Sequence, residues 1–445
     1  MHYIPQLIFL IVLGIANYGI FKSIKRIKFN INLGRPEKRN DQKLKRFKIM
    51  TLMALGQKKM FKKPLPAIFH FLIYLGFIIV NLEVLEIVLD GIFGTHRIFA
   101  PYISNIYPLF INIFEFFAVA VIIACIVFLS RRNLLNINRF QGEEMKKWPK
   151  IDANTILIVE VFLMIAFLVM NTVDLVLQSR GYGHYSNTGI FFISGNLMQV
   201  FNSFSSENLV FVERFCWWFH IIGILCFANY VFWDSKHLHI FMAFPNTYFS
   251  KLEAPGKWPN MPAVTKEVKL MLNLPLEEAD QLPDNEKVKF GAKDVQDLTW
   301  KNLFDAYSCT ECGRCTQQCP ANITGKKLSP RKIMMDTRDR MELVGKNIAL
   351  HGPEFSDGKN LLEDYITSEE IFACTTCNAC VEACPVNINP LDIIVQLRQY
   401  KIMEASQAPG SWNGMFSNIE NNSAPWKFPS ADRFNWADNL NSEQK

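Results

Sequence analysis

The sequence predicts an all-α protein, in which a bundle of five membrane-spanning helices is followed by a smaller helical domain. Three observations lead to this fold class. Half of the 445 residues are hydrophobic, and most of these fall in the first 240 positions. That part holds five apolar runs long enough to cross a bilayer, which takes about 20 residues. The rest of the chain has helix-starting signals and eight of the eleven cysteines, in two copies of one pattern.

The apolar runs define a membrane part that we expect to cover residues 1–240. The loop at 22–63 contains fifteen Lys and Arg residues, whereas the segments at 90–105 and 178–207 carry almost none. Because basic loops stay on the cytoplasmic side, we expect the N-terminus outside a bacterial inner membrane and the second domain in the cytoplasm. The net charge of +6 follows from these loops and requires no nucleic acid partner. The five runs are 3–21, 64–89, 106–130, 154–177 and 209–233.

The cysteine pattern is Cys-x-x-Cys-x-x-Cys-x-x-x-Cys-Pro, the spacing of bacterial ferredoxins. A [4Fe–4S] cluster needs four inward-pointing thiolates, and in two-cluster ferredoxins the fourth Cys of each run binds the other cluster. This rule divides the eight cysteines into two ligand sets. We expect the first cluster on Cys309, Cys312, Cys315 and Cys384, and the second on Cys374, Cys377, Cys380 and Cys319.

Zinc and disulfides are the alternatives for such cysteines. Zinc would need only two Cys-x-x-Cys pairs per site, which leaves the third Cys and the Cys-Pro ending without a reason. Disulfides need an oxidising compartment, whereas the expected topology puts this segment in the cytoplasm. Iron–sulfur clusters therefore fit the pattern best.

Helix-starting signals around the cysteines predict a helical domain over 297–404, after a linker over 241–296. Thr299 can cap a helix that runs into Cys309, and Ser329 followed by a proline opens another helix. Thr367 and Glu370 form a capping box just before the second cysteine run. The domain is therefore expected to be mostly helical, unlike the small β-rich ferredoxins.

Histidines in or near the apolar runs are candidate haem ligands, because polar side chains at membrane depth are costly and usually functional. A b-type haem takes two axial imidazoles at one depth from facing helices. His70 lies about 10 Å beyond Lys63 along the second helix. His220 lies in the outer half of the fifth helix, and His237 and His239 follow at its cytoplasmic end. Interfacial histidines that contact lipid are the alternative.

These two helices resemble the five-helix cytochrome b subunit of respiratory nitrate reductase and, more closely, the membrane cytochrome of heterodisulfide reductase. The resemblance implies a cytochrome b bundle in which His70 and His239 hold a cytoplasmic-side haem, with His237 as the alternative to His239. It also makes His220 a ligand of an outer haem. It rests on Phe69-His70, Leu75-Gly76-Phe77, His220 and Lys236-His237-Leu238-His239.

The chain departs from that family at the outer haem. The second-helix ligand expected about ten residues past His70 falls at Val80 and Asn81, neither of which is a usual haem ligand. One haem is therefore expected, and a second would need His96 or His184 as the partner of His220.

Three acidic residues in the outer halves of the helices, Glu83, Glu115 and Asp174, are candidates for carrying protons to or from a quinone. Pairing with Arg214 and capping of helix contacts are the alternative roles for these carboxylates.

The cysteine domain resembles the helical two-cluster domain of three proteins: the iron–sulfur subunit of succinate dehydrogenase, the two-cluster subunit of heterodisulfide reductase and the electron-transfer subunit of anaerobic glycerol-3-phosphate dehydrogenase. The matching segments are 309–315 and 373–380.

The tail at 405–445 is a candidate docking segment. In relatives of heterodisulfide reductase, a similar tail leads to a module with CCG motifs, which this sequence lacks. Three tryptophans in the tail favour a packed interface. We therefore expect the tail to dock a separate CCG-type iron–sulfur protein, like the CCG-containing subunits of heterodisulfide reductase.

Together these features predict an electron-transfer subunit of a respiratory, quinone-linked oxidoreductase. The sequence has neither a Gly-rich dinucleotide loop nor a nucleophile with a base, so no catalytic residue is expected. Electrons would pass between the quinone pool, haem b, the two clusters and the partner, to which an electron-transfer flavoprotein or another dehydrogenase could connect. The alternatives are a membrane-anchored redox sensor and a structural membrane anchor for a soluble dehydrogenase.

Overall fold

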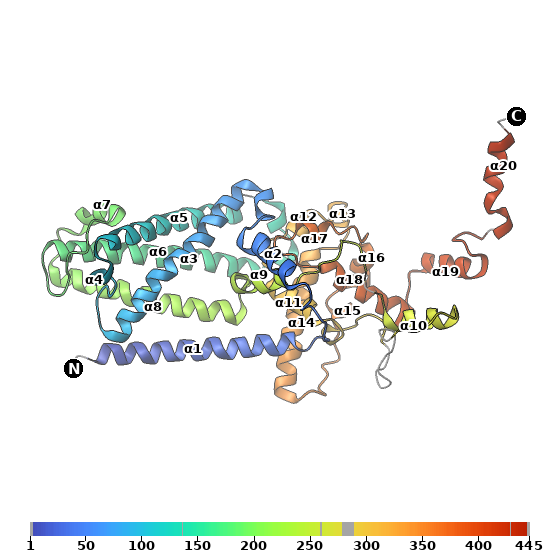
Figure 1. Cartoon of the computed structure of the whole chain (residues 1–445), viewed down its shortest axis with the longest axis horizontal. Coiled ribbons are helices and arrows are strands. Elements are labelled where there is room, and N and C mark those ends of the chain that lie inside the picture. The colour runs from blue at the N-terminus through green and yellow to red at the C-terminus, as the bar shows by residue number, and fades with distance from the viewer. Residues whose placement is uncertain (1–2, 136, 259, 278–288, 428, 443–445) are drawn as a thin grey trace.

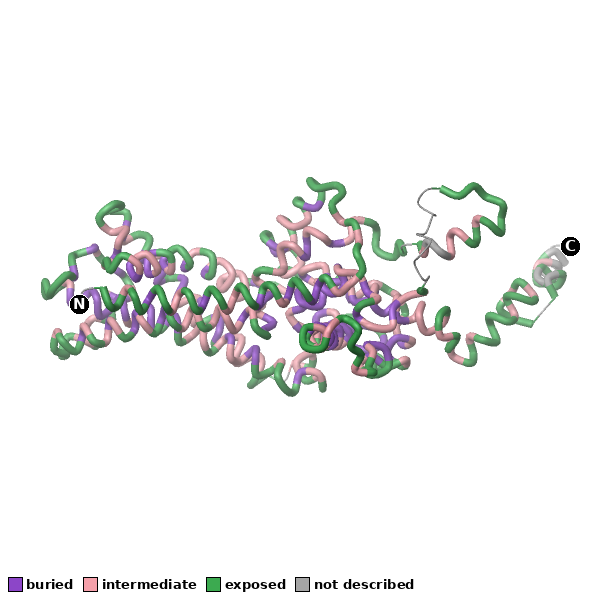
Figure 2. The backbone as a smooth tube through the Cα atoms, turned by 90° about the horizontal axis from the view of Figure 1, so that it is seen from below, coloured by how far each residue is buried: buried purple, intermediate pink, exposed green. Residues whose placement is uncertain are grey.

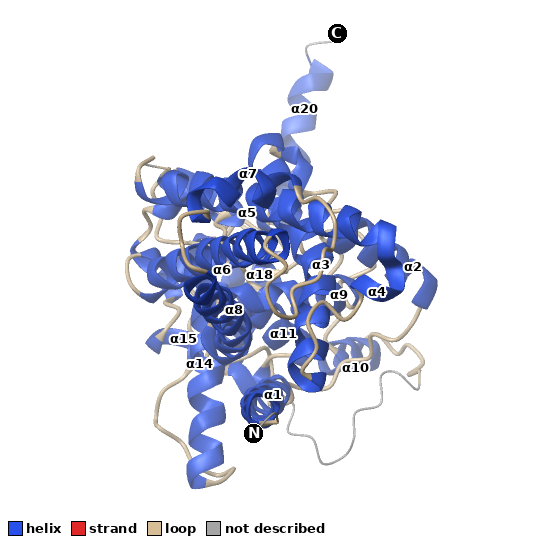
Figure 3. Cartoon of the chain, turned by 90° about the vertical axis from the view of Figure 1, so that its left-hand side faces the viewer, coloured by secondary structure: helices blue, strands red, loops and turns tan. Residues whose placement is uncertain are grey.

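The computed structural model describes residues 3–135, 137–258, 260–277, 289–427 and 429–442. Helices build the fold, and no β-strand occurs within these ranges (Figure 3). A bundle of long helices occupies one end of the elongated molecule, shorter helices follow it, and the C-terminal helices extend away from both (Figure 1). The prediction of an all-α protein is confirmed.

Five helices are long and apolar enough to cross a membrane, which indicates a membrane protein. Helix α6 lies at the centre of the bundle, and α1 is the most exposed of the five. A short helix, α7 (Phe192–Phe201), packs on α6 at the end remote from the cysteines. The five helices are α1 (Ile4–Ile31), α3 (Pro64–Phe93), α5 (Tyr107–Asn133), α6 (Trp148–Ser179) and α8 (Ser206–Asp234).

The predicted caps at Thr299, Ser329 and Thr367 start three helices of the cysteine part, and Asn389 caps a fourth. The Thr299 and Thr367 side chains each form a capping box, and Ser329 and Asn389 accept a hydrogen bond from a backbone N–H three residues ahead. Four shorter helices lie between or beside the cysteines: α12 (Arg314–Gln317), α13 (Pro320–Ile323), α15 (Leu361–Asp364) and α17 (Ala379–Ala383). The four capped helices are α11 (Trp300–Ser308), α14 (Pro330–His351), α16 (Ser368–Ala373) and α18 (Pro390–Gln399).

The bundle and the cysteine part share one hydrophobic core. Ile27 of α1 and Leu238, just after α8, are buried in the same cluster as Leu303 of α11. Polar contacts cross the same boundary, since Asn30 donates a hydrogen bond of 2.8 Å to the Tyr307 hydroxyl. The two parts therefore pack directly on each other.

The segments on either side of the cysteine part differ in how they pack. In the expected linker, α9 (His239–Tyr248) packs on α11 and on α2 (Lys43–Met50), whereas α10 (Pro262–Met271) is more exposed. The tail forms α19 (Gly410–Asn422) and α20 (Asn435–Ser442), which are largely exposed (Figure 2). Among the described residues, the chain thus stays packed through the first turns of the expected linker, whereas α10 and the tail helices are more exposed.

Candidate functional site

The two cysteine runs adopt the same local backbone. In each run the second and fourth residues after the first Cys have positive φ: Glu311 (54°) and Gly313 (70°) in one, Thr376 (56°) and Asn378 (60°) in the other. Left-handed backbone is tolerated best by Gly and Asn, which occupy the fourth position of the two runs. The repeated spacing therefore encodes a repeated loop.

Helices α12 and α17 pack against each other and bring the two runs together. One small cavity is lined by Cys309, Cys312, Cys315 and Cys384, and another by Cys319, Cys374, Cys377 and Cys380. Each cavity thus collects three thiols from one run and one from the other, in the two sets that the spacing predicts.

The thiols of each set lie around a cavity and do not converge on the position of a single metal ion. No three described His, Cys, Asp or Glu residues gather closely enough to hold a single metal ion. A [4Fe–4S] core, with four irons and four sulfides, is held by thiolates spread around it. The donor set therefore fits clusters of this kind.

The surroundings of the sulfurs are apolar and supply hydrogen bonds to them. Burial raises the pKa of the Cys309, Cys380 and Cys384 thiols to about 12, so metal binding must displace their protons. Backbone N–H groups donate to sulfur at Cys374, from Thr376 (3.4 Å), and at Cys384, from Ile388 (3.3 Å). Such hydrogen bonds tune cluster potentials.

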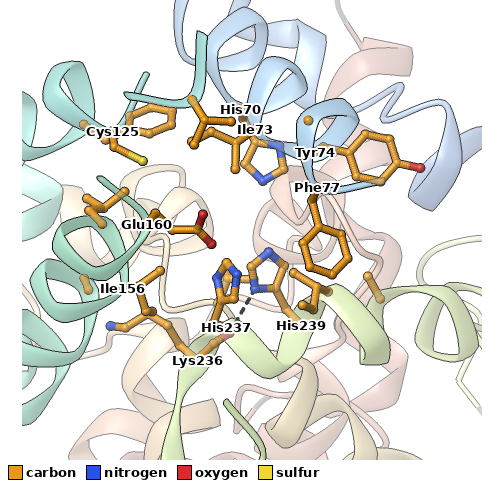
Figure 4. Close-up of a pocket in the computed structure, with 18 of the residues that line it drawn as sticks. His70, Ile73, Tyr74, Phe77, Cys125, Ile156, Glu160, Lys236, His237 and His239 are labelled. Atoms are coloured by element: carbon orange, nitrogen blue, oxygen red, sulfur yellow. Dashed lines mark hydrogen bonds between the residues drawn. The ribbon is translucent and has the colours of Figure 1, made fainter. Parts of the chain in front are cut away.

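A larger cavity of about 430 Å³ lies inside the bundle at its cysteine end. His70 from α3 and His239 from α9 face each other across it, with ring centroids 6.3 Å apart (Figure 4). The Nδ1 of His70 lies 3.2 Å from the Gln57 Oε1, and the Nδ1 of His239 lies 3.0 Å from the backbone oxygen of Lys236. In both rings the Nδ1 atom makes these contacts, and the Nε2 atom takes no part in them.

His237 lines the same cavity, with its ring centroid 5.5 Å from that of His239. Burial lowers the pKa of His237 to about 3, and its histidine neighbours add to the shift. The ring is therefore neutral at physiological pH, which is the form that binds metals. His237 stays the alternative to His239.

The histidine cavity and the first cysteine cavity share a wall. Cys312, Arg314 and Pro385 line both of them. The histidine pair thus lies next to the first cysteine set. The second set shares no lining residue with the histidine cavity and includes the exposed Cys377. This order follows from the contacts between the halves of the chain, and the sequence gives no signal for it.

His220 lines the same large cavity from α8 and is fully buried. Its Nδ1 lies 2.9 Å from the Leu163 oxygen, and its Nε2 has no hydrogen-bond partner. The ring next to it is that of Phe167, at 6.0 Å, and no imidazole pairs with it among the described residues. Glu83 Oε2 lies 4.0 Å from the free Nε2.

His96 and His184 pair with each other instead, with ring centroids 5.2 Å apart. His96 Nε2 also lies 3.5 Å from an oxygen of Asp174. The contacts described for these two histidines therefore do not include His220.

The other acidic candidates occupy structural positions. Glu115 accepts hydrogen bonds of 3.1 Å from the backbone N–H groups of Ile193 and Ser194, in the first turn of α7. Asp174 forms an ion pair with Arg97. The Glu115 contact belongs to the helix-capping role expected from sequence. The expected pairing with Arg214 is not found, because Asp174 pairs with Arg97 and Arg214 binds Glu213. The Glu83 Oε2 is buried with no hydrogen-bond partner.

Sequence reasoning missed the ion pair that joins the two halves of the site. Lys236 of the Lys-His-Leu-His stretch binds Glu311 of the first cysteine run, and both side chains are buried. Arg338 of α14 binds the same carboxylate at 2.9 Å. Burial would raise the pKa of Glu311, but these two cations outweigh it and hold the pKa below its usual range.

Comparison with known proteins assigns the cysteine part. Residues 308–388 match the family model of the 4Fe-4S dicluster domain. We call this matching segment the dicluster domain. Its cysteines make iron–sulfur clusters the cofactor of the dicluster domain, and no solved structure matches the chain.

Curated relatives extend the likeness beyond the dicluster domain. The chain is 27% identical to the probable iron–sulfur-binding oxidoreductase FadF of Bacillus subtilis, over 97% of this chain and 60% of that protein. It is 26% identical to an EtfAB:quinone oxidoreductase of Syntrophomonas wolfei, over 90% of this chain and 55% of that protein. The chain thus spans little more than half the length of these relatives.

The resemblance to heterodisulfide reductase is also found. One subunit of a ferredoxin/F420H2-dependent CoB–CoM heterodisulfide reductase of Methanosarcina acetivorans is 35% identical, over 24% of this chain and 52% of that protein. Together, the dicluster domain and these relatives support an iron–sulfur electron-transfer role in a membrane protein.

Proposed function

We propose that this chain conducts electrons between the quinone pool and a soluble iron–sulfur partner, through one haem b and two [4Fe–4S] clusters. The observation that carries the proposal is the His70–His239 pair, which faces across a cavity that shares a wall with the first cysteine set. When bound, the haem and the clusters supply one-electron carriers. The residues of the chain hold and orient them.

The histidine pair fits a haem iron. Two axial imidazoles with metal–nitrogen bonds of about 2.0 Å place their ring centroids roughly 6 Å apart. The 6.3 Å between His70 and His239 agrees with that distance. The oxygens of Gln57 and Lys236 orient the two rings through Nδ1, as outer partners of metal-bound histidines do.

The ligand sets and their order define the route. Cys309, Cys312, Cys315 and Cys384 would hold the cluster next to the histidines, and Cys374, Cys377, Cys380 and Cys319 the cluster nearer the surface. The exposed Cys377 puts the second set within reach of a soluble partner. The basic residues at 22–63 lie in the last turns of α1 and in its connection to α3, at the end of the bundle next to the dicluster domain (Figure 1). Their positive charge favours a cytoplasmic location for that end.

The partner would be a CCG-type iron–sulfur protein that docks on the tail. Trp412 of α19 packs on Phe372 of α16, with ring centroids 5.2 Å apart, which ties the start of the tail to the dicluster domain. Farther along, Trp426 and Trp436 are 70% and 64% exposed and could pack in an interface. An electron-transfer flavoprotein or another dehydrogenase would exchange electrons through this partner, in the direction set by the donor.

Haem content of purified variants tests the proposal. We expect one haem per full-length chain in the wild type and none in His70→Ala or His239→Ala, with the cluster EPR signals kept in both. His96→Ala is the matched control, because His96 lies outside the cavity, and should keep its haem. If the wild type carries clusters without haem, the chain is a structural anchor and the proposed route is wrong.

A further inference from the structure

The wall of the histidine cavity toward the dicluster domain carries arginines without carboxylate partners. Arg131 and Arg132 come from the last turn of α5, and Arg139 from a short 3-10 turn over Asn138–Phe140. All three line the cavity together with His70 and His239. Within the described residues, no carboxylate forms an ion pair with any of the three, and the Arg139 Nε is buried without a hydrogen-bond partner.

The nearby acidic residues are bound to other groups. Glu144 pairs with Arg331 at 2.7 Å, and Glu311 pairs with Lys236 and Arg338. The Asp152 carboxylate accepts hydrogen bonds from the Tyr230 and Ser235 hydroxyls, at 2.6 and 2.7 Å. These carboxylates therefore form no direct ion pair with Arg131, Arg132 or Arg139, and no ion pair joins Glu160, which lines the same cavity, to any of them.

Two of the arginines converge on one ring. The guanidinium carbons of Arg132 and Arg139 lie 4.7 and 4.8 Å from the centroid of Phe140 and hence less than 10 Å from each other. Two like charges held this close in partly buried positions repel each other and lose hydration. An anionic ligand in the cavity would offset both costs, and a pair of carboxylates would match the pair of guanidinium groups.

We infer that Arg132 and Arg139 bind the two propionate carboxylates of the haem, with Arg131 at the rim of the same site. The inference rests on the proposed function, since it requires the haem between His70 and His239. It assigns the arginine wall to the propionate edge and so orients the haem with that edge toward the first cysteine set. Arg139 lies against that set as well, because its backbone oxygen would be 3.2 Å from a Cβ at Gly313.

The experiment compares Arg132→Gln, Arg139→Gln and the double variant with the wild type, as purified full-length protein. A positive charge near the haem favours the reduced state, so each substitution should lower the haem midpoint potential, and the double variant should lower it most. Loss of a charge-assisted hydrogen bond should also weaken haem retention by about tenfold per arginine. Arg132→Lys keeps the positive charge, so its haem midpoint potential should stay closer to the wild-type value than that of Arg132→Gln.

Controls separate this inference from a fold defect and from the proposed function. Lys150→Gln removes one charge from an exposed position at the start of α6 and should leave the potential unchanged. Cluster EPR intensity reports folding in every variant. If the wild type has haem but neither arginine variant shifts its potential or retention, the propionate site is wrong while the haem proposal stands.

Two other anionic groups are alternatives to the propionates, and a different result would identify each of them. If the arginine variants lose bound phospholipid phosphate and keep the haem potential, the wall binds lipid headgroups. If Arg139→Gln shifts only the potential of the first cluster, this arginine offsets the cluster charge instead.

Discussion

The two ends of the helical bundle differ in whether their arginines form ion pairs. At the end away from the dicluster domain, Arg97 is buried and donates hydrogen bonds to Asp174, Tyr107 and Asn171. At the dicluster end, Arg132 and Arg139 line a cavity that also contains Glu160, and neither arginine forms an ion pair with a carboxylate among the described residues. The first arrangement neutralises itself and holds the helices together. The second lacks such direct pairing, and this difference is why we propose the ligand site at the dicluster end.

Removal of Arg97 should have the largest effect on stability. Arg97→Ala removes the arginine that neutralises the buried Asp174, which should cost about 3–5 kcal/mol of unfolding free energy. Thermal unfolding in detergent measures the loss. Arg132→Gln breaks no ion pair within the described residues and should change the midpoint temperature of unfolding far less than Arg97→Ala does. Equal losses in the two variants would contradict the contrast between the ends.

Glu115 tests whether its carboxylate anchors a helix or carries protons. Glu115→Ala removes the acceptor for Ile193 and Ser194 and should cost about 2–3 kcal/mol, with faster proteolysis near α7. The haem spectrum should stay unchanged, because the proposed haem site lies at the other end. If quinol oxidation stops while stability is kept, Glu115 is a proton carrier instead.

The Glu144–Arg331 pair gives a pH-dependent prediction outside the bundle. Burial acts to raise the pKa of Glu144, but the ion pair and hydrogen bonds with Arg331 outweigh it and hold the pKa below its usual 4.5. The carboxylate therefore contributes stability above that pH and loses it as the pH falls through the lowered pKa.

We expect Glu144→Gln to be less stable than the wild type by about 1–2 kcal/mol at neutral pH. The difference should shrink below pH 4.5 and vanish in stronger acid. Unfolding curves across pH measure it. A difference that grows on acidification would mean that the pair does not act as an ion pair.

The tail tryptophans should have the smallest effect on the chain alone. Trp426 and Trp436 are mostly exposed, so Trp426→Ala and Trp436→Ala should change stability by less than about 0.5 kcal/mol. Both should weaken capture of a CCG-type iron–sulfur partner in pull-downs from the native membrane. Leu44→Ala, at an 83% exposed position on α2, is the control and should keep the partner. Unchanged capture of the partner by both tryptophan variants would contradict the proposed docking role of the tail.

The parts of the site that follow local rules could be predicted from sequence. The spacing of the cysteines fixes which thiols meet, because each run folds into one short loop and the fourth Cys projects toward the neighbouring loop. Helix starts at Ser329 and Thr367 likewise depend on residues within one turn. Position in or near the apolar runs makes His70 and His239 candidates, the resemblance pairs them, and the fold brings them face to face.

The missed features depend on contacts between distant segments. Lys236 and Glu311 look like ordinary surface charges in the sequence, yet they meet at the boundary between the bundle and the dicluster domain. Arg132 and Arg139 look like basic residues flanking a membrane helix, and only the packed structure turns them toward the cavity. The start of α9 was expected in a surface linker for the same reason, since its packing partner α11 lies more than fifty residues away.

The central claim is that one haem and two clusters form a single route through this chain. An anaerobic optical and EPR redox titration of the purified full-length protein tests it most directly. The account predicts one low-spin haem and two [4Fe–4S] clusters per chain, with the signal of one cluster broadened by the nearby haem. Two cluster signals without a haem band, or a haem whose oxidation state leaves both cluster signals unaffected, would contradict it.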